Sequence, residues 1–110
     1  MKHILFTLRG CDSKLLNSNH HIRTGLIKAS RLSGSKVMDV STHCFSPQGV
    51  TSIALLSDSH LSIHTWPEEG TAVCDIFTCG SNTTPEKGIE YLKEWLSATD
   101  IESQTIIRSL

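Results

Sequence analysis

The sequence has no excess of positive charge and no long apolar run. Its 10 lysine and arginine residues are offset by 11 aspartate and glutamate residues, for a formal charge of −1, and the basic residues form no cluster. Such a chain lacks the basic patch that binds phosphate backbones. The longest aliphatic run in the interior, residues 53–56, is far shorter than the about 20 residues that span a bilayer. We therefore expect neither nucleic acid nor a membrane among its partners.

Signals for export, disulfides and metal binding are also missing. The apolar run at residues 4–6 lies between Lys2 and Arg9 and is too short for the core of a signal peptide. The four cysteines include no C-x-x-C pair, and the histidines include no H-x-x-x-H pair on a predicted helix. These absences predict a cytoplasmic protein with four thiols, no disulfide framework and no bound metal.

The 110 residues suit a single domain with one core. Period-two alternation and β-prone runs predict six strands, at residues 3–8, 38–44, 51–56, 61–65, 72–79 and 101–108. Ser18 or Asn19 opens one predicted helix, which Gly34 ends. Thr84 and Pro85 open the other. The order β-α-β-β-β-β-α-β favours an α+β fold, a two-layer sandwich whose mostly antiparallel sheet carries both helices on one face.

The densest group of reactive side chains is SDSHLSIHTWPE, residues 57–68, which combines hydroxyl, carboxylate and imidazole groups. A serine hydroxyl becomes a nucleophile when another group takes its proton. The residues also fit a plain structural interpretation, in which Asp58 and Ser59 are turn formers, His64 is a strand imidazole and Cys79 is a small core residue. By spacing alone, the structural interpretation is the better one.

Taken together, however, the motifs resemble a known family. SDSHLSIHTWPE followed by DIFTCG, residues 75–80, is similar to the signature of the short prokaryotic S-adenosylmethionine decarboxylases, which are pyruvoyl enzymes of spermidine synthesis. The GCD at residues 10–12, the F-x-P-x-G-V turn at residues 45–50 and the closing helix also occur in the family's order and spacing. The resemblance therefore covers most of the chain.

The resemblance implies that the chain is a proenzyme that cuts itself. Ser59 would attack the carbonyl carbon of Asp58, and elimination and hydrolysis would leave a β chain, residues 1–58, and an α chain, residues 59–110. The α chain would begin with a pyruvoyl group made from Ser59. This cofactor would form a Schiff base with the substrate amino group and accept the electron pair released with carbon dioxide.

The family's other functional residues carry over to further positions. His64 matches the proton acceptor of processing, and Thr51 stands where the family has a processing serine. Cys79 matches the proton donor of decarboxylation, a role that needs an S–H group near the substrate α-carbon. Phe45 matches an aromatic residue that stacks on adenine, and Glu68 matches a carboxylate that binds the ribose hydroxyls. By similarity, the active protein would be a homodimer of cleaved protomers with sites close to the interface.

Two predicted substrate-binding positions depart from the family pattern. Asp58 replaces a glutamate, and Leu8 stands where an aromatic residue usually forms the other half of an adenine sandwich. Because one aromatic platform holds a nucleoside less firmly, arginine or ornithine decarboxylation is an alternative activity. A non-catalytic regulatory homologue is a second alternative. Such a protein would be expected to lose Ser59, His64 or Cys79, yet all three are present.

Overall fold

The computed structural model describes residues 1–57 and 59–110, so Asp58, the residue before the predicted cleavage point, lies outside the described residues. The strands are β1 (Lys2–Arg9), β2 (Val37–Cys44), β3 (Val50–Leu56), β4 (His60–Trp66), β5 (Thr71–Thr78) and β6 (Asp100–Ile107). The helices are α1 (Ser13–Leu16), α2 (Asn19–Leu32) and α3 (Pro85–Trp95), with a 3-10 turn, η1 (Pro67–Glu69). Within the described ranges, no helix has the length and apolar character needed to cross a membrane.

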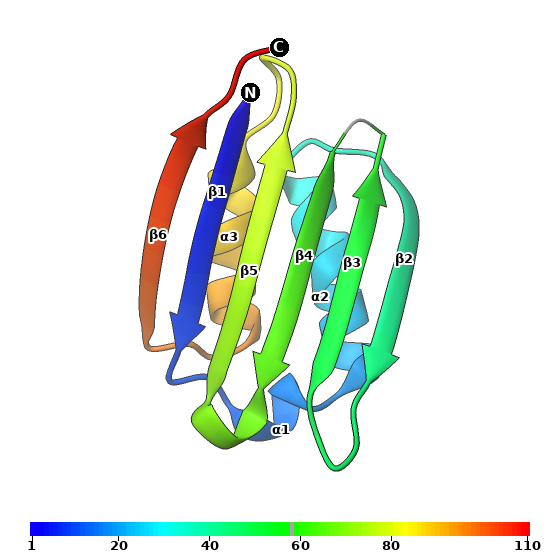
Figure 1. Cartoon of the computed structure of the whole chain (residues 1–110), viewed down its shortest axis with the longest axis vertical. Helices are drawn as coiled ribbons and strands as arrows, with labels where there is room; N and C mark the ends of the chain where they lie inside the picture. Colours follow the sequence, from blue (N-terminus) through cyan, green and yellow to red (C-terminus); the bar gives the residue numbers. More distant parts are fainter. Residues whose placement is uncertain (58) are drawn as a thin grey trace.

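The strands form one antiparallel sheet in the order β2-β3-β4-β5-β1-β6. In Figure 1, α2 and α3 lie side by side behind this sheet, and both ends of the chain lie at the same edge of the molecule. The Met1 ammonium group donates a hydrogen bond of 3.1 Å to the Arg108 carbonyl oxygen. This arrangement confirms the predicted α+β sandwich with two main helices on one face, and each predicted strand agrees within one residue at both ends.

Alternate residues of the central strands point towards the helices and form the core. Leu8, Leu61 and Ile76 are at most 1% exposed, and they join Leu26 of α2 and Leu92 of α3 in one apolar cluster. Burying a side chain of this size stabilises the fold by roughly 1.5–3 kcal/mol. The other face of the sheet carries no helix of the described residues. We call it the open face.

Helices α2 and α3 approach each other closely because glycine lies at both contacts. A Cβ atom on Gly88 of α3 would lie 2.7 Å from the Ala29 carbonyl oxygen of α2. A Cβ atom on Gly25 of α2 would lie 2.4 Å from the Trp95 ring. Such distances are too short for real Cβ atoms, so both glycines are needed for the helices to cover the sheet as one layer.

The helix ends follow the predicted signals, with one addition. Ser18 Oγ accepts a hydrogen bond of 3.1 Å from the His21 backbone N–H at the start of α2, and Gly34 follows the helix with φ of 86°. The short helix α1 was not predicted. Its N-cap is Asp12, whose carboxylate accepts hydrogen bonds from two backbone N–H groups of α1.

Strands β3 and β4 form the hairpin that carries the reactive stretch. Thr51 lies opposite His64 near one end of this hairpin, and His60 lies near the other end. There, the Leu56 backbone N–H donates a hydrogen bond of 2.9 Å to the Ser59 carbonyl oxygen. Because β4 begins with His60, one residue earlier than predicted, Ser59 is the last residue of the connection.

Candidate active site

Ser59 and Cys79 lie at the same end of neighbouring strands. Ser59 immediately precedes β4, and Cys79 immediately follows β5. The two strands are antiparallel neighbours in which His60 lies opposite Phe77. Both Ser59 and Cys79 are half-buried. The sheet therefore brings together the two residues that the sequence predicts as the pyruvoyl precursor and the proton donor.

Two other cysteines are poorly placed for proton transfer at this site. Cys11 and Cys74 belong to the apolar core, at 9% and 4% exposure. Burial raises the pKa of the Cys11 thiol. Burial raises the pKa of Cys74 well above its ordinary value, and nearby negative charge adds to this effect. Cys79, at the strand end, is the better candidate.

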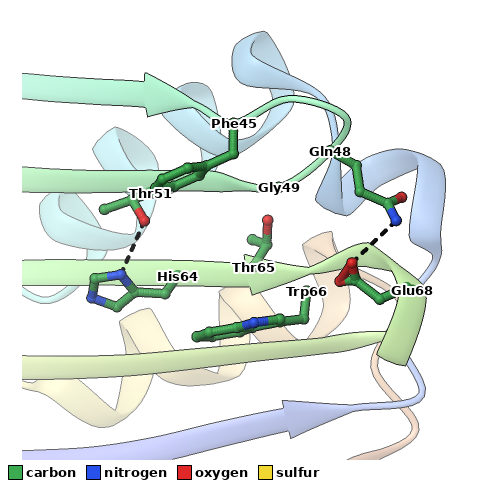
Figure 2. Close-up of a pocket in the computed structure, with 8 residues that line it drawn as sticks. All are labelled: Phe45, Gln48, Gly49, Thr51, His64, Thr65, Trp66 and Glu68. Carbon is green, nitrogen blue, oxygen red and sulfur yellow. Dashed lines mark hydrogen bonds between the residues drawn. The ribbon is translucent and has the colours of Figure 1, made fainter.

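Thr51 and His64 form a second polar site at the far end of the same hairpin. Thr51 Oγ1 and His64 Nδ1 are 3.0 Å apart (Figure 2). Five residues separate His64 from Ser59, and an extended strand rises about 3.3 Å per residue, so about 16 Å lie between their Cα atoms. Within one chain, the structure therefore does not place His64 beside Ser59, as a proton acceptor in processing would require.

A pocket of about 350 Å³ opens beside this second site (Figure 2). Its walls include the aromatic rings of Phe45 and Trp66 and the Glu68 carboxylate, which accepts a hydrogen bond of 3.1 Å from the Gln48 side-chain amide. Aromatic rings and a carboxylate suit a ligand that carries a flat ring and hydroxyl groups. Phe45 and Glu68, both predicted to bind substrate, thus line one pocket. Trp66 is a lining residue that the sequence analysis missed.

Leu8 lines neither site. Its side chain is 0% exposed because it points into the core between the sheet and the helices. The prediction that Leu8 contacts the substrate is therefore wrong. The signal was available in the sequence, since alternation along β1 places Leu8 on the same face as the buried Ile4 and Phe6.

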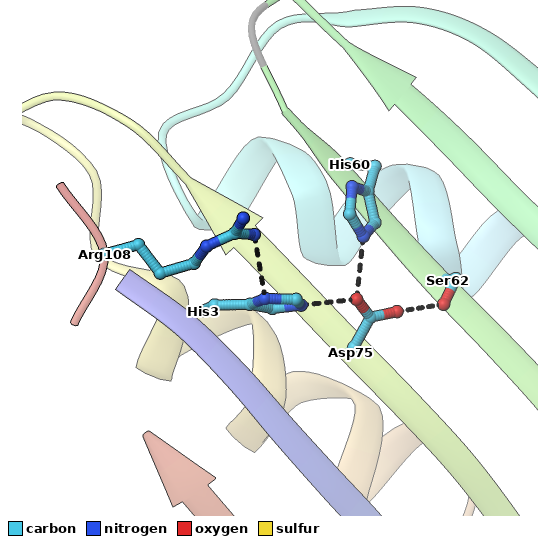
Figure 3. Close-up of polar contacts among 5 residues, drawn as sticks. All are labelled: His3, His60, Ser62, Asp75 and Arg108. Atoms are coloured by element: carbon cyan, nitrogen blue, oxygen red, sulfur yellow. Dashed lines mark hydrogen bonds and ion pairs between the residues drawn. The ribbon is translucent and has the colours of Figure 1, made fainter. Parts of the chain in front are cut away.

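A third polar group lies on the open face and was not predicted (Figure 3). The Asp75 carboxylate accepts hydrogen bonds from Nε2 of His3 and Nε2 of His60, each at 2.7 Å, and from the Ser62 hydroxyl. Burial raises the pKa of Asp75, but these hydrogen bonds outweigh burial and hold that pKa below its ordinary value. The Arg108 guanidinium lies 3.5 Å from His3 Nδ1. We call these five residues the Asp75 cluster.

Three members of the Asp75 cluster have the composition of a metal site. The ligand atoms of His3, His60 and Asp75 lie within 4.8 Å of one another. However, both imidazoles already donate to one carboxylate oxygen, and the positive charge of Arg108 lies against the other nitrogen of His3. A metal ion would have to displace two protons and tolerate that charge. The geometry therefore fits a hydrogen-bonded cluster better than a metal centre.

Comparison with known proteins places this fold and these residues in a family. The family model described as S-adenosylmethionine decarboxylase matches residues 2–109. The chain belongs to the S-adenosylmethionine decarboxylase family. It is 44% identical over 109 residues to an S-adenosylmethionine decarboxylase proenzyme from Methanococcus maripaludis, covering 99% of this chain and 89% of the relative. It is 42% identical over 107 residues to one from Synechococcus, covering 97% of this chain and 84% of the relative.

Solved structures agree with the assignment. The crystal structure of the adenosylmethionine decarboxylase from Aquifex aeolicus superposes with a TM-score of 0.91 at 32% identity, covering 99% of this chain and 90% of that chain. The Trypanosoma brucei AdoMetDC-delta26 monomer superposes with a TM-score of 0.70 at 19% identity, covering 93% of this chain and 44% of that chain, which supports the fold alone. The resemblance inferred from the sequence motifs is confirmed, and the family is one of enzymes.

Proposed function

We propose that this protein decarboxylates S-adenosyl-L-methionine through a pyruvoyl group that it makes from its own Ser59. The observation that carries the proposal is the placement of Ser59 and Cys79 at the same end of two neighbouring strands. Family membership supports it, because the relatives are named proenzymes and a proenzyme is a precursor of an active form. The product would be S-adenosylmethioninamine, made in the cytoplasm for spermidine synthesis.

Processing would cut the chain at the end of the β3–β4 hairpin. Ser59 Oγ would attack the carbonyl carbon of Asp58 and turn the amide into an ester. Elimination would leave a carboxylate on Asp58, and hydrolysis with loss of ammonia would leave a ketone at position 59. The hydrogen bond from Leu56 N–H to the Ser59 carbonyl oxygen restrains the attacking residue. Because β3 and β4 stay paired, the products 1–58 and 59–110 would remain in one sheet.

The surroundings of Ser59 fit a pyruvoyl group. The residue is half-buried and lies at the same strand ends as a thiol. Once formed, the group would supply a ketone that can bond to the substrate amino group with loss of water, so that the electron pair of the broken carbon–carboxylate bond can be accepted. Cys79 would then deliver the proton that the substrate carbon needs. Cys11 and Cys74 point into the core and could not serve in its place.

A single chain does not contain a complete site. Ser59 and Cys79 lie at one end of β4, whereas the pocket with Phe45, Glu68 and His64 lies at the other. Two chains could pack open face to open face about a two-fold axis that lies between the sheets and runs across the strands. This symmetry reverses the strand direction in the second chain. The beginning of β4 in one chain would therefore face the end of β4 in the other. We therefore propose a homodimer in which His64 of the partner subunit lies near Ser59.

The open face has the composition of such an interface. Its large apolar side chains are 39–55% exposed in the single chain: Leu5, Ile53, Leu55, Trp66, Val73 and Ile106. Apolar groups gathered on one face mark an interaction surface, and a second sheet can pack about 10 Å away. A second copy of this chain would bring its pocket and His64 to Ser59 of the first chain, and the first chain would do the same for the second. An unrelated partner would not supply these groups.

Release of carbon dioxide tests the proposed activity and substrate. We expect the purified protein to release carbon dioxide from carboxyl-labelled S-adenosylmethionine, and to act roughly 100-fold more slowly on arginine or ornithine, which cannot fill the pocket of Phe45 and Glu68. Release from arginine or ornithine alone would contradict the proposed substrate. An uncut chain that releases nothing from any of the three would instead indicate a regulatory role.

A further inference from the structure

The Asp75 cluster fastens the beginning of β4 to its neighbours (Figure 3). Asp75 lies on β5 and accepts hydrogen bonds from His60 and Ser62, two alternate residues of β4. Its third donor, His3, comes from β1 on the other side of β5. One carboxylate thus joins three adjacent strands, and its first contact on β4 is the residue directly after Ser59.

Aromatic packing encloses this contact. The His3 and His60 rings meet edge to face with centroids 5.9 Å apart, and the Phe77 ring lies 5.3 Å from His3. The Arg108 guanidinium lies 5.1 Å above the Phe77 ring. The Asp75 side chain is 21% exposed. Hydrogen bonds to an ionised group are stronger than neutral ones, and partial exclusion of water strengthens them further.

Cleavage before Ser59 would make this fastening important. In the uncut chain Ser59 is held by covalent bonds on both sides. After the cut it begins a chain, and chain ends are poorly ordered unless they are tied down. The paired residues of β4 begin at His60 and the Ser59 carbonyl oxygen is bound by the Leu56 N–H, so the ketone of a pyruvoyl group at position 59 would lie just beyond these contacts and depend on how firmly they are held. Misplacement of a reacting group by about 1 Å can slow a reaction on the order of 100-fold.

We propose that Asp75 is a positioning residue, which holds the new chain end in place after cleavage by binding the side chains of His60 and Ser62. The inference rests on the proposed function, because it needs the cut before Ser59. In this role Asp75 touches no substrate and acts only through β4. It follows that removing the carboxylate should spare the cut, made while Ser59 is still tethered, and should impair turnover.

The test compares Asp75→Ala with Glu90→Ala, a control that removes an exposed carboxylate from α3 on the other side of the sheet. Intact mass gives the cleaved fraction, assays with S-adenosylmethionine give kcat per cleaved chain and KM, and hydrogen exchange gives local opening. For Asp75→Ala we expect normal cleavage, kcat lowered about tenfold and KM within about threefold. Exchange should rise at the backbone amides of residues 60–62 in cleaved protein only, since a pyruvoyl group at position 59 has no amide N–H. Glu90→Ala should match the wild type.

Ser62→Ala removes one of the three donors to Asp75 and keeps the test usable where Asp75→Ala does not fold. We expect it to lower kcat by about threefold, with the same local rise in exchange. Wild-type kcat and wild-type exchange in the cleaved variants would overturn the inference. A folded Asp75→Ala that is not cut would also overturn it, because the carboxylate would then serve processing. An uncut wild type would refute the proposed function instead.

Discussion

Thr51 Oγ1 lies 3.0 Å from His64 Nδ1 across the β3–β4 hairpin, at the end opposite Ser59. The pair borders the pocket of Phe45 and Glu68. A hydroxyl and an imidazole are thus held together where neither reaches the serine of the same chain. If these groups act in processing, they act on the partner subunit's Ser59.

Mixed dimers should restore cleavage of the chain that lacks His64. Alone, His64→Ala and Ser59→Ala should both stay uncut. When the two are co-expressed, we expect the His64→Ala chain to be cut, because in a mixed dimer its Ser59 meets the intact His64 of the partner subunit. Intact mass distinguishes the two chains. A His64→Ala chain that stays uncut in mixed dimers would rule out action across the interface.

Removal of the Cys79 thiol should separate cleavage from turnover. Ester formation at Ser59 does not use the thiol, so Cys79→Ala should be cut to the wild-type extent. Its kcat should fall roughly 100-fold, since protonation by a positioned group contributes at least that factor. Cys79→Ser should also be slow, because an alcohol gives up its proton far less readily than a thiol. If Cys79→Ala had the kcat of the wild type, a group other than Cys79 would have to deliver the proton.

Changes in the pocket should act on substrate binding. Phe45→Ala removes an aromatic platform worth roughly 1 kcal/mol, which corresponds to about a fivefold rise in KM. Glu68→Gln removes a charged acceptor and should raise KM about tenfold. Both should leave cleavage and kcat nearly unchanged, because neither residue contacts the reacting atoms. Unchanged KM values for S-adenosylmethionine in both variants would show that the substrate binds elsewhere.

The Asp75 carboxylate should make stability depend on acid pH. Burial raises its pKa, but the hydrogen bonds from Ser62, His3 and His60 lower it by more, so the folded pKa lies below the unfolded value of about 3.9. A lowered folded pKa gives stability that is fully present above the unfolded pKa and is lost as pH falls through the folded pKa. Urea unfolding should therefore give a larger free energy of unfolding for the wild type than for Asp75→Asn near neutral pH. This difference should shrink below about pH 4. A difference in the free energy of unfolding that stays constant from pH 7 to pH 3 would contradict this.

The four central strands, β3, β4, β5 and β1, could be predicted from the sequence because one side of each is largely buried. Leu61 and Ile63 alternate with polar residues in β4, and each predicted boundary lies within one residue of the observed one. Helix α1 was missed because four residues are too few to show helical periodicity. Its signal was local, in the capping side chain of Asp12.

The candidate site could be predicted only in part. Ser59 and Cys79 were placed correctly at strand ends, because turn residues mark those ends. The Asp75 cluster was missed because local periodicity does not reveal the order of strands in the sheet. It does not show that β1, which carries His3, lies beside β5, which carries Asp75. The separation of His64 from Ser59 follows from strand geometry alone, since five extended residues span about 16 Å. The catalytic roles of these residues stay predictions.

The intact mass of purified, active protein tests the central claim most directly. We predict two chains, residues 1–58 with an ordinary carboxyl end at Asp58, and residues 59–110 with a pyruvoyl group in place of the serine. An unbroken chain in active protein, with Ser59 still an alcohol, would contradict the claim.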